Sequence, residues 1–506
     1  MIQISIDGSS MSLEEIMLIG SEDVKLTLTE TSIQSMVKSR EHVEAILDSG
    51  AIVYGINTGF GSLSNVSVDS NGLKELQRNL VLSHACGIGP AMSPESVLRM
   101  MAIRANSLAK GASGIRVEVV EMLIDLVNNG HAPIIPSIGS LGASGDLAPL
   151  AHMAMALIGE GRFQSRKDGQ WLDSESATVF KDIGRSPVIL QAKEGLSLIN
   201  GTSQMCAYLA EATTLATRLC HAADSACAMS VEAIAGSHTP FDPRIHGVRN
   251  QVGQAKSAER ILSYLHDSEI KESHADCDRV QDAYSFRCAP QVHGAVIDVV
   301  ESATRIVVGD ANSATDNPLI VPDGNGGYDV LSGGNFHGEP LALSADSLAS
   351  AIHELCSISE RRTNQMLTPH WSGLPAFLAR NGGLESGLMI LHYVSASALA
   401  KIRLLASPAA LTNIPVSAEK EDHVSMGSTA TERLIEICEL ASCVIANEMI
   451  VASAALDFRS EKPGIGVARL VERVREVSDP VIGDRSMSND TNALASKILL
   501  GGVGNE

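Results

Sequence analysis

The stretch TSQMCAYLAEATTLATRLCHAADSACAMSVEAIA, residues 202–235, decides the fold because it contains neither glycine nor proline. Residues 341–368 and 428–462 share this property. Since Gly and Pro are the residues that most often end a helix, segments of this length predict helices of roughly 40–50 Å. Several such helices predict a long bundle. Many are apolar on more than one face, so we expect contacts between subunits rather than one large monomeric core.

The first part of the chain has a different pattern. Alternating apolar residues predict short strands at 2–6 and 24–28, on either side of a helical turn at SLEEIM. Helical periodicity follows at 31–50, where Gly50 stands at the C-terminal cap, and then at 72–85, 94–110 and 115–129. We therefore predict a mainly α fold of two parts. Residues 1–195 form a mixed, loop-rich N-terminal part, and residues 196–506 form a long-helix bundle domain.

Composition excludes several classes of partner. A net charge of −21 argues against nucleic acid and anionic membranes. No uncharged apolar run reaches the length of a transmembrane helix, and the first residues lack the pattern of a signal peptide. The nine cysteines are irregularly spaced without a CxxC pair, which predicts free thiols in the cytoplasm. The histidines show neither HxxxH nor HExxH spacing, so we expect no metal site.

Residues 139–147, GSLGASGDL, stand in a Pro/Gly-rich connection of about 16 residues, a length typical of functional loops. Taken alone, the stretch is also compatible with a tight turn. It is neither a P-loop nor a GxSxG elbow, although Ser144 could be a nucleophile with His152 or His84 as its base. Another chemistry fits Ala143-Ser144-Gly145 better. The backbone nitrogen of Gly145, which has no Cβ to obstruct it, can attack the carbonyl carbon of Ala143. Loss of two waters, one carrying the Ser144 hydroxyl, then leaves an electrophilic exocyclic methylene.

The segment GSLGASGDLAPLAH closely resembles the signature of the ammonia-lyase family whose prosthetic group, 4-methylidene-imidazole-5-one (MIO), forms autocatalytically from Ala-Ser-Gly. The stretches YGINTGFG, NGTS, QDAYSFR, TDNPL, GGNFHGE and NGGL match the family in the same order, from about residue 50 to 460. The resemblance implies a helical lyase architecture like that of fumarase and aspartase, with no external cofactor. It also implies a homotetramer whose active sites are shared between subunits.

Within the family, the residues point to L-histidine as the substrate. The histidine-specific members carry Ser-His where this chain has Ser83-His84, and a QEDHVSMG stretch where it has KEDHVSMG, with Glu421 retained. The implied reaction gives trans-urocanate and ammonia, the first step of histidine degradation. Either the amine or the imidazole ring attacks MIO, and both routes stay open. The departures from the family are Lys420, Ala283 and His293.

The resemblance also implies roles for individual residues. Tyr54 is the expected base; because an ordinary tyrosine has a pKa of about 10, its anion would need stabilisation. Tyr284 is the second candidate for proton transfer, and Arg287 should pair with the substrate carboxylate. His84 and Glu421 should address the imidazole. The other expected site residues are Ser83, Asn200, Gln281 and Phe336.

Three alternatives remain open. A phenylalanine or tyrosine ammonia-lyase, or an aminomutase, would use the same MIO with a different pocket. A serine amidase using Ser144 would keep its full sequence mass, whereas MIO formation removes two waters. A helical assembly protein without activity would have no need of the complete Ala-Ser-Gly and both tyrosines.

Overall fold

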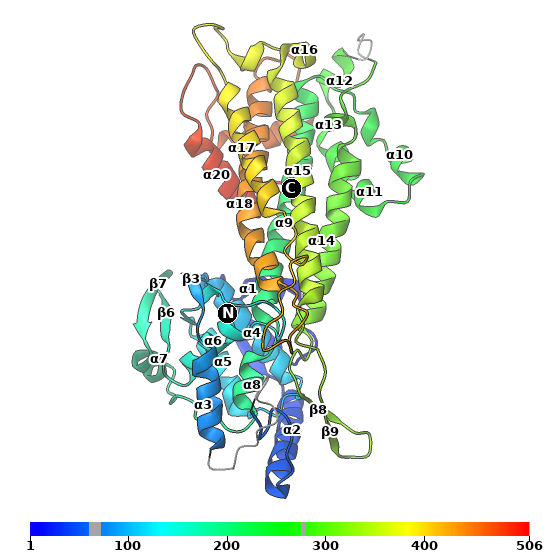
Figure 1. Ribbon diagram of the computed structural model, residues 1–506. Coiled ribbons are helices and arrows are strands. Elements are labelled where there is room, and N and C mark those ends of the chain that lie inside the picture. The colour runs from blue at the N-terminus through cyan, green and yellow to red at the C-terminus, as the bar shows by residue number, and fades with distance from the viewer. Residues whose placement is uncertain (60–71, 275–279, 505–506) are drawn as a thin grey trace. The chain divides into compact units, whose positions relative to one another are not determined.

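The computed structural model describes residues 1–59, 72–274 and 280–504 (Figure 1). These residues form two compact units. Unit 1 comprises residues 1–211, 303–346 and 408–432, and unit 2 comprises 212–302, 347–407 and 433–506. Two residues of YGINTGFG, Phe60 and Gly61, lie outside the described residues, as does Cys277.

Unit 1 begins as the sequence predicts. Strand β1 (Ile2–Ile6) pairs in parallel with β2 (Val24–Leu28), and helix α1 (Leu13–Leu18) connects them. Helix α2 (Glu30–Ser49) starts where Thr29 accepts a hydrogen bond from the nitrogen of Ser32. It ends at Gly50, whose φ of +72° is the left-handed conformation of a C-terminal cap.

The rest of unit 1 packs short helices against small sheets. Its helices are α3 (Leu73–His84), α4 (Pro94–Ala109), α5 (Val117–Asn128), α6 (Leu147–Leu157), α7 (Ser176–Asp182) and α8 (Glu194–Ile199). Its further strands are β3 (Ile88–Ala91), β4 (His131–Pro133), β5 (Pro136–Ile138), β6 (Arg162–Lys167), β7 (Gln170–Glu175), β8 (Leu319–Pro322) and β9 (Tyr328–Leu331). The predicted connection before Ala143 therefore holds two strands: β4 pairs with β6, and β5 with β3.

Four long helices cross the boundary between the units: α9 (Ser203–Ala233), α14 (Ala289–Ala311), α15 (Glu339–Leu367) and α18 (Gly427–Leu456). Three of them match the segments without glycine and proline, so the predicted mainly helical fold is confirmed. Unit 2 adds α10 (Pro243–Gly247), α11 (Val252–Tyr264), α12 (Glu269–Ser273), α13 (Tyr284–Arg287), α16 (Pro369–Ser372), α17 (Met389–Leu405), α19 (Ile465–Arg475) and α20 (Ser488–Leu499), with short 3-10 turns at Thr239–Phe241 and Ala376–Leu378.

Buried charges join the long helices inside unit 2. Arg362 of α15 donates to Glu448 of α18 over 2.8 Å, and Ser230 of α9 donates to the same carboxylate over 2.7 Å. His293 of α14 pairs with Asp224 of α9 over 2.7 Å. Because buried charges are stable only when paired, these contacts fix the register of the four helices.

The two units differ from the two parts expected from the sequence, which meet at a single boundary near residue 195. The first unit continues to residue 211, and the segments 303–346 and 408–432 return to it. Within the described residues, no helix combines the length and the apolar character that crossing a membrane requires.

Candidate active site

The Ala143-Ser144-Gly145 loop of unit 1 lies directly against the backbone of Gly201. Ala143 and Gly145 are buried, and Ser144 is partly exposed. Gly145 has a φ of +73°, and the nitrogen of Asp146 donates to the oxygen of Gly201 over 2.6 Å. A Cβ on Gly145 would stand 2.6 Å from the Gly201 nitrogen, and nearer still to its carbonyl. Only glycine fits this position, in conformation and in space.

Asn200 holds the middle of the tripeptide. It follows α8 as its C-terminal cap and is 4% exposed. Its Nδ2 donates to the backbone oxygen of Ser144 over 2.8 Å, whereas its Oδ1 is buried without a hydrogen-bond partner. A buried acceptor without a partner is costly, which is typical of a group that awaits a ligand.

Asp146 anchors the C-terminal side of the loop. Its Oδ2 accepts from the nitrogens of Gln204 and Met205 over 2.8 and 3.1 Å, and Ser140 donates to its Oδ1 over 3.0 Å. Burial raises the pKa of this carboxyl to about 7, although these hydrogen bonds oppose the shift. Ser140 and Asp146 thus fix the turn on both sides of the tripeptide.

Two distant segments of unit 1 close around the N-terminal side of the loop. The oxygen of Gly142 accepts from the nitrogen of Gly338 over 3.0 Å and from the Ser425 hydroxyl over 2.9 Å. Ala143 packs in a cluster with Val424 and Met426. Phe336 is half-buried and stands two residues before Gly338, which contacts the loop directly.

A tight turn presents Glu421. Val416 and Glu421 exchange backbone hydrogen bonds of 3.0 and 3.3 Å, and Val416 packs against the cluster that contains Ala143. Between them, Ser417, Ala418 and Glu419 have φ values of +54°, +53° and +65°. Such backbone strain is concentrated at functional sites. Lys420, the departure from the family, is exposed.

Ser83 and His84 end helix α3. The oxygen of Leu80 accepts a 2.8 Å hydrogen bond from Nδ1 of His84, so in the neutral ring the lone pair lies on Nε2, where another donor can reach it. The Ser83 hydroxyl donates to the same oxygen over 3.1 Å. His152, the other candidate base for Ser144, accepts from the nitrogen of Gly87 over 3.1 Å, and burial lowers its pKa.

Tyr54 is half-buried in unit 1, in the turn that continues to Gly55 and Ile56. A Cβ on Gly55 would lie 2.7 Å from Pro318 and 3.0 Å from Leu196. Leu196 stands four residues before Asn200, so this turn packs against the short helix that presents Asn200.

The remaining expected residues, Gln281, Tyr284 and Arg287, belong to unit 2. The guanidinium of Arg287 lies 4.4 Å from the ring centre of Tyr284, which is 71% exposed. Nε of Arg287 is buried without a hydrogen-bond partner, and Gln281 is exposed. This cation–π pair is thus available to a ligand or another chain.

The other two departures from the family are accommodated structurally. Fully buried His293 bonds Asp224 and lies 3.3 Å from Arg362, which donates to the oxygen of Ser285. His293 thereby supports the helix that carries Tyr284 and Arg287. Ala283 caps this helix with a φ of −61°, a value that proline also adopts.

One cluster has the composition of a metal site. Ligand atoms of His337, Glu339 and His423 lie within 4.8 Å of one another. Both ring nitrogens of His337 already contact backbone groups, at 3.3 Å from the nitrogen of Glu339 and 3.2 Å from the oxygen of His423. The cluster therefore connects the segment of Gly338 with the segment of Ser425, and both of these residues donate to the oxygen of Gly142.

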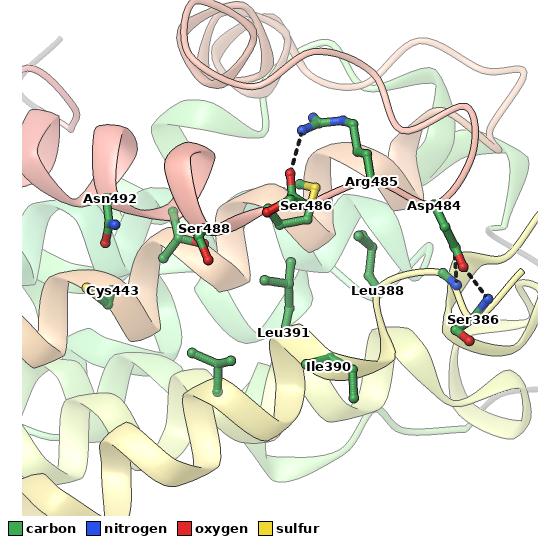
Figure 2. A pocket seen from close by; sticks show the side chains of 14 residues that line it. Ser386, Leu388, Ile390, Leu391, Cys443, Asp484, Arg485, Ser486, Ser488 and Asn492 are labelled. Carbon is green, nitrogen blue, oxygen red and sulfur yellow. Dashed lines mark hydrogen bonds between the residues drawn. The ribbon is translucent and has the colours of Figure 1, made fainter.

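A pocket of about 430 Å³ lies in unit 2, between the start of α17 and the start of α20 (Figure 2). Asp484 accepts there from the nitrogens of Ser386 and Gly387, and Arg485 donates to the Ser486 backbone. The residues that line this pocket include none of the expected site residues.

Comparison with known proteins assigns the class. The family model of aromatic amino acid lyases matches residues 11–476, and the chain belongs to this family. The histidine ammonia-lyase of Myxococcus xanthus is 44% identical over 98% of this chain and 96% of its own length. The crystal structure of histidine ammonia-lyase from Trypanosoma cruzi has a TM-score of 0.90 at 37% identity, covering 99% of this chain and 94% of that one. Tyrosine aminomutase from Streptomyces globisporus has a TM-score of 0.91 at 33% identity, covering 99% and 97%. The predicted family and enzyme class are confirmed.

Sequence reasoning missed several residues that support the site. Ser140 lies inside the quoted signature, yet its type suggested only a turn. Asp316 lies inside TDNPL, a stretch that matches the family, but the sequence indicated no role for this residue. Arg104 and Lys193 are fully buried cations in the same unit. For Arg104, a signal was its place in the otherwise mostly apolar run MMAIRANSLA.

Proposed function

We propose that this protein is a histidine ammonia-lyase that converts L-histidine to trans-urocanate and ammonia, with MIO formed from Ala143-Ser144-Gly145. The observation that carries the proposal is the contact of Gly145 with Gly201, together with the hydrogen bond from Asn200 to Ser144. These contacts hold a tripeptide whose central residue alone is partly exposed.

The residues present fit the prosthetic group. Ring closure joins the nitrogen of Gly145 to the carbonyl carbon of Ala143, and the oxygen of Ala143 leaves as one water. Ser144 loses its hydroxyl and an α-proton as the second. Asn200 would hold the oxygen of residue 144, while Asp146 and Ser140 keep the turn in place. Once formed, MIO supplies the electrophile that activates the amino acid for loss of ammonia.

The arrangement of unit 1 favours imidazole as the ring of the substrate. In the neutral ring of His84, Nε2 presents a lone pair, and Glu421 presents carboxyl oxygens, so either residue can accept the N–H of an imidazole. A phenyl ring would leave these groups unpaired at a cost of roughly 1–3 kcal/mol each. Curated relatives at 44% identity carry the name histidine ammonia-lyase, which supports the same choice.

Tyr54 would take the β-proton, and Arg287 would bind the carboxylate with two parallel hydrogen bonds. Tyr284 would assist proton transfer, Ser83 and Gln281 would line the site, and Phe336 would pack on the substrate. We propose that the protein is a homotetramer with shared active sites, in which one subunit supplies the Tyr284–Arg287 pair to another. The exposure of Tyr284 supports this.

One experiment tests the activity and its main competitors. The protein is incubated in parallel with L-histidine, L-phenylalanine and L-tyrosine, while ultraviolet absorbance records the conjugated acid. We expect product from L-histidine at a far higher kcat/KM than from the aryl amino acids. Faster turnover of L-phenylalanine or L-tyrosine would favour an aryl lyase, and a β-amino acid product would favour an aminomutase. Light scattering should give a tetramer; an active monomer of 53.3 kDa would contradict shared sites.

A further inference from the structure

Arg104 is a buried arginine whose guanidinium lies on Gly201. It belongs to α4 and is 0% exposed. A Cβ built on Gly201 would overlap Nη1 of Arg104 and would stand 2.9 Å from the Thr315 hydroxyl. Gly201 also lies against Gly145, so it contacts the guanidinium and the reactive tripeptide.

Arg104 also caps the helix that ends at Asn200. The last carbonyls of a helix lack partners within it, and cations are favourable at this end. In α8, the oxygen of Leu196 accepts from the nitrogen of Asn200 over 2.9 Å, and the oxygen of Ser197 accepts from Nη2 of Arg104. Nη1 donates to Thr315 over 3.3 Å. The guanidinium therefore ties the end of α8 to the segment that contains Thr315.

Buried carboxyl groups balance this cation. Burial lowers the pKa of Arg104 to about 10, and the charges of Asp316 and Asp146 oppose the shift. Asp316 accepts from Lys193 over 2.6 Å, and Lys193 donates to the Ser197 hydroxyl over 3.1 Å. Arg104 therefore stays charged at neutral pH, inside a network that contacts α8 at Lys193, its N-cap, and at Ser197.

We propose that Arg104 is a positioning residue for ring closure: by capping α8 and covering Gly201, it fixes Asn200 and Gly201 where they hold Ser144 and Gly145. The inference rests on the proposed function, because it concerns formation of the same prosthetic group. It predicts that replacing Arg104 slows the loss of the two waters more than it disturbs folding. A misplacement of about 1 Å can slow a positioned reaction about 100-fold, so we expect slowing of roughly 10- to 100-fold.

The test follows the intact mass of the full chain after translation is stopped. Arg104→Lys keeps the charge but loses the fork that reaches both Ser197 and Thr315, and Arg104→Met removes the charge. Thr315→Val removes one acceptor at nearly constant volume. Arg99→Lys is the matched control: Arg99 lies on the same helix, is 5% exposed and pairs with Glu211 over 2.9 Å, and the atoms nearest to a Cβ on Gly201 belong to Arg104 and Thr315 instead. Circular dichroism and thermal midpoints record folding.

We expect wild type and Arg99→Lys to lose both waters at similar rates. Arg104→Lys and Thr315→Val should fold and lose them more slowly, and Arg104→Met should be the slowest. If Arg104→Met does not fold, the rates at which Arg104→Lys and Thr315→Val lose the two waters decide the test. Folded Arg104→Lys and Thr315→Val with the rate of wild type would overturn the inference and leave the proposed function intact. Slowing by Arg99→Lys equal to that by Arg104→Lys would also overturn it, because general destabilisation would then explain both. A wild type that keeps its full mass would overturn the proposed function itself.

Discussion

The Nδ2 of Asn200 donates a 2.8 Å hydrogen bond to the backbone oxygen of Ser144, while the Oδ1 of the same amide is buried without a partner. One end of this amide thus holds the tripeptide, and the other end is left for a ligand. Asn200 is also the C-terminal cap of α8, the helix in which the oxygen of Ser197 accepts from Arg104.

Asn200→Asp should therefore impair ring closure. A carboxylate cannot donate to the Ser144 oxygen, and a buried charge beside it is unfavourable. We expect most chains to keep their full mass and activity to fall by at least roughly 100-fold. Asn128→Asp is the control, since Asn128 bridges both backbone groups of Leu26, at 2.7 and 3.0 Å, outside the site. Complete loss of two waters in Asn200→Asp would contradict the role of this hydrogen bond.

Gly145→Ala should block formation of the prosthetic group, because the added Cβ would overlap Gly201. Gly169→Ala separates this overlap from backbone strain. Gly169 has a φ of +79°, close to the +73° of Gly145, but nothing lies within 4 Å of its Cβ position. Both variants bear a conformational cost of about 1 kcal/mol. Intact mass should show two lost waters in Gly169→Ala only, and the same mass loss in both would refute the close-approach argument.

Glu421→Gln should lower kcat/KM for L-histidine while the mass still shows the loss of two waters. The carboxylate that addresses the imidazole is gone, but the turn from Val416 to Glu421 is held by backbone bonds and persists. Replacing Ser83-His84 by Phe-Leu should lower histidine turnover further and shift preference toward L-phenylalanine. Steady-state kinetics on both amino acids measure this. Unchanged histidine turnover in Glu421→Gln would remove Glu421 from the imidazole pocket.

The pKa of Asp146 predicts a pH-dependent stability. Because burial raises this pKa from 3.8 to about 7, the native state holds a proton that the unfolded chain releases. The resulting stabilisation is full below pH 4 and is lost as the pH rises through 7. Asp146→Asn removes this titration, and its amide can keep the bonds to Ser140, Gln204 and Met205.

The comparison is best made in a Ser144→Ala background, where neither chain can form the ring. Thermal midpoints at pH 5 and pH 8 should show Asp146→Asn gaining stability relative to its parent at the higher pH. A difference that stays constant across this range would contradict the raised pKa.

Local signals in the sequence predicted much of this fold. Gly50 ends α2 with the expected left-handed cap, and three segments without glycine and proline became α9, α15 and α18. The hairpin of β6 and β7 was not predicted, since its charged, half-exposed residues lack a clear alternation. The return of 303–346 and 408–432 to unit 1 depends on contacts between distant segments, which no local pattern encodes.

The candidate site likewise contains residues that the sequence predicts and residues that it does not. Ring chemistry and the family motifs restrict the types of Ala143, Ser144, Gly145 and Asn200, and the structure brings these residues together, although their roles stay predictions. The support from Arg104 could not be predicted, because it depends on a hydrogen bond from α4 to Ser197, which lies about 90 residues further along the chain. The roles of the other expected residues stay predictions as well: Tyr54, Ser83, His84, Gln281, Tyr284, Arg287, Phe336 and Glu421.

Intact mass of the purified wild type, beside Ser144→Ala, tests the central claim most directly. Ala143-Ser144-Gly145 should have lost two waters in wild type, and Ser144→Ala should show no hydroxyl-dependent loss, keep its fold and lose nearly all activity. A wild type at its full sequence mass, or a Ser144→Ala protein that still converts L-histidine, would contradict the account.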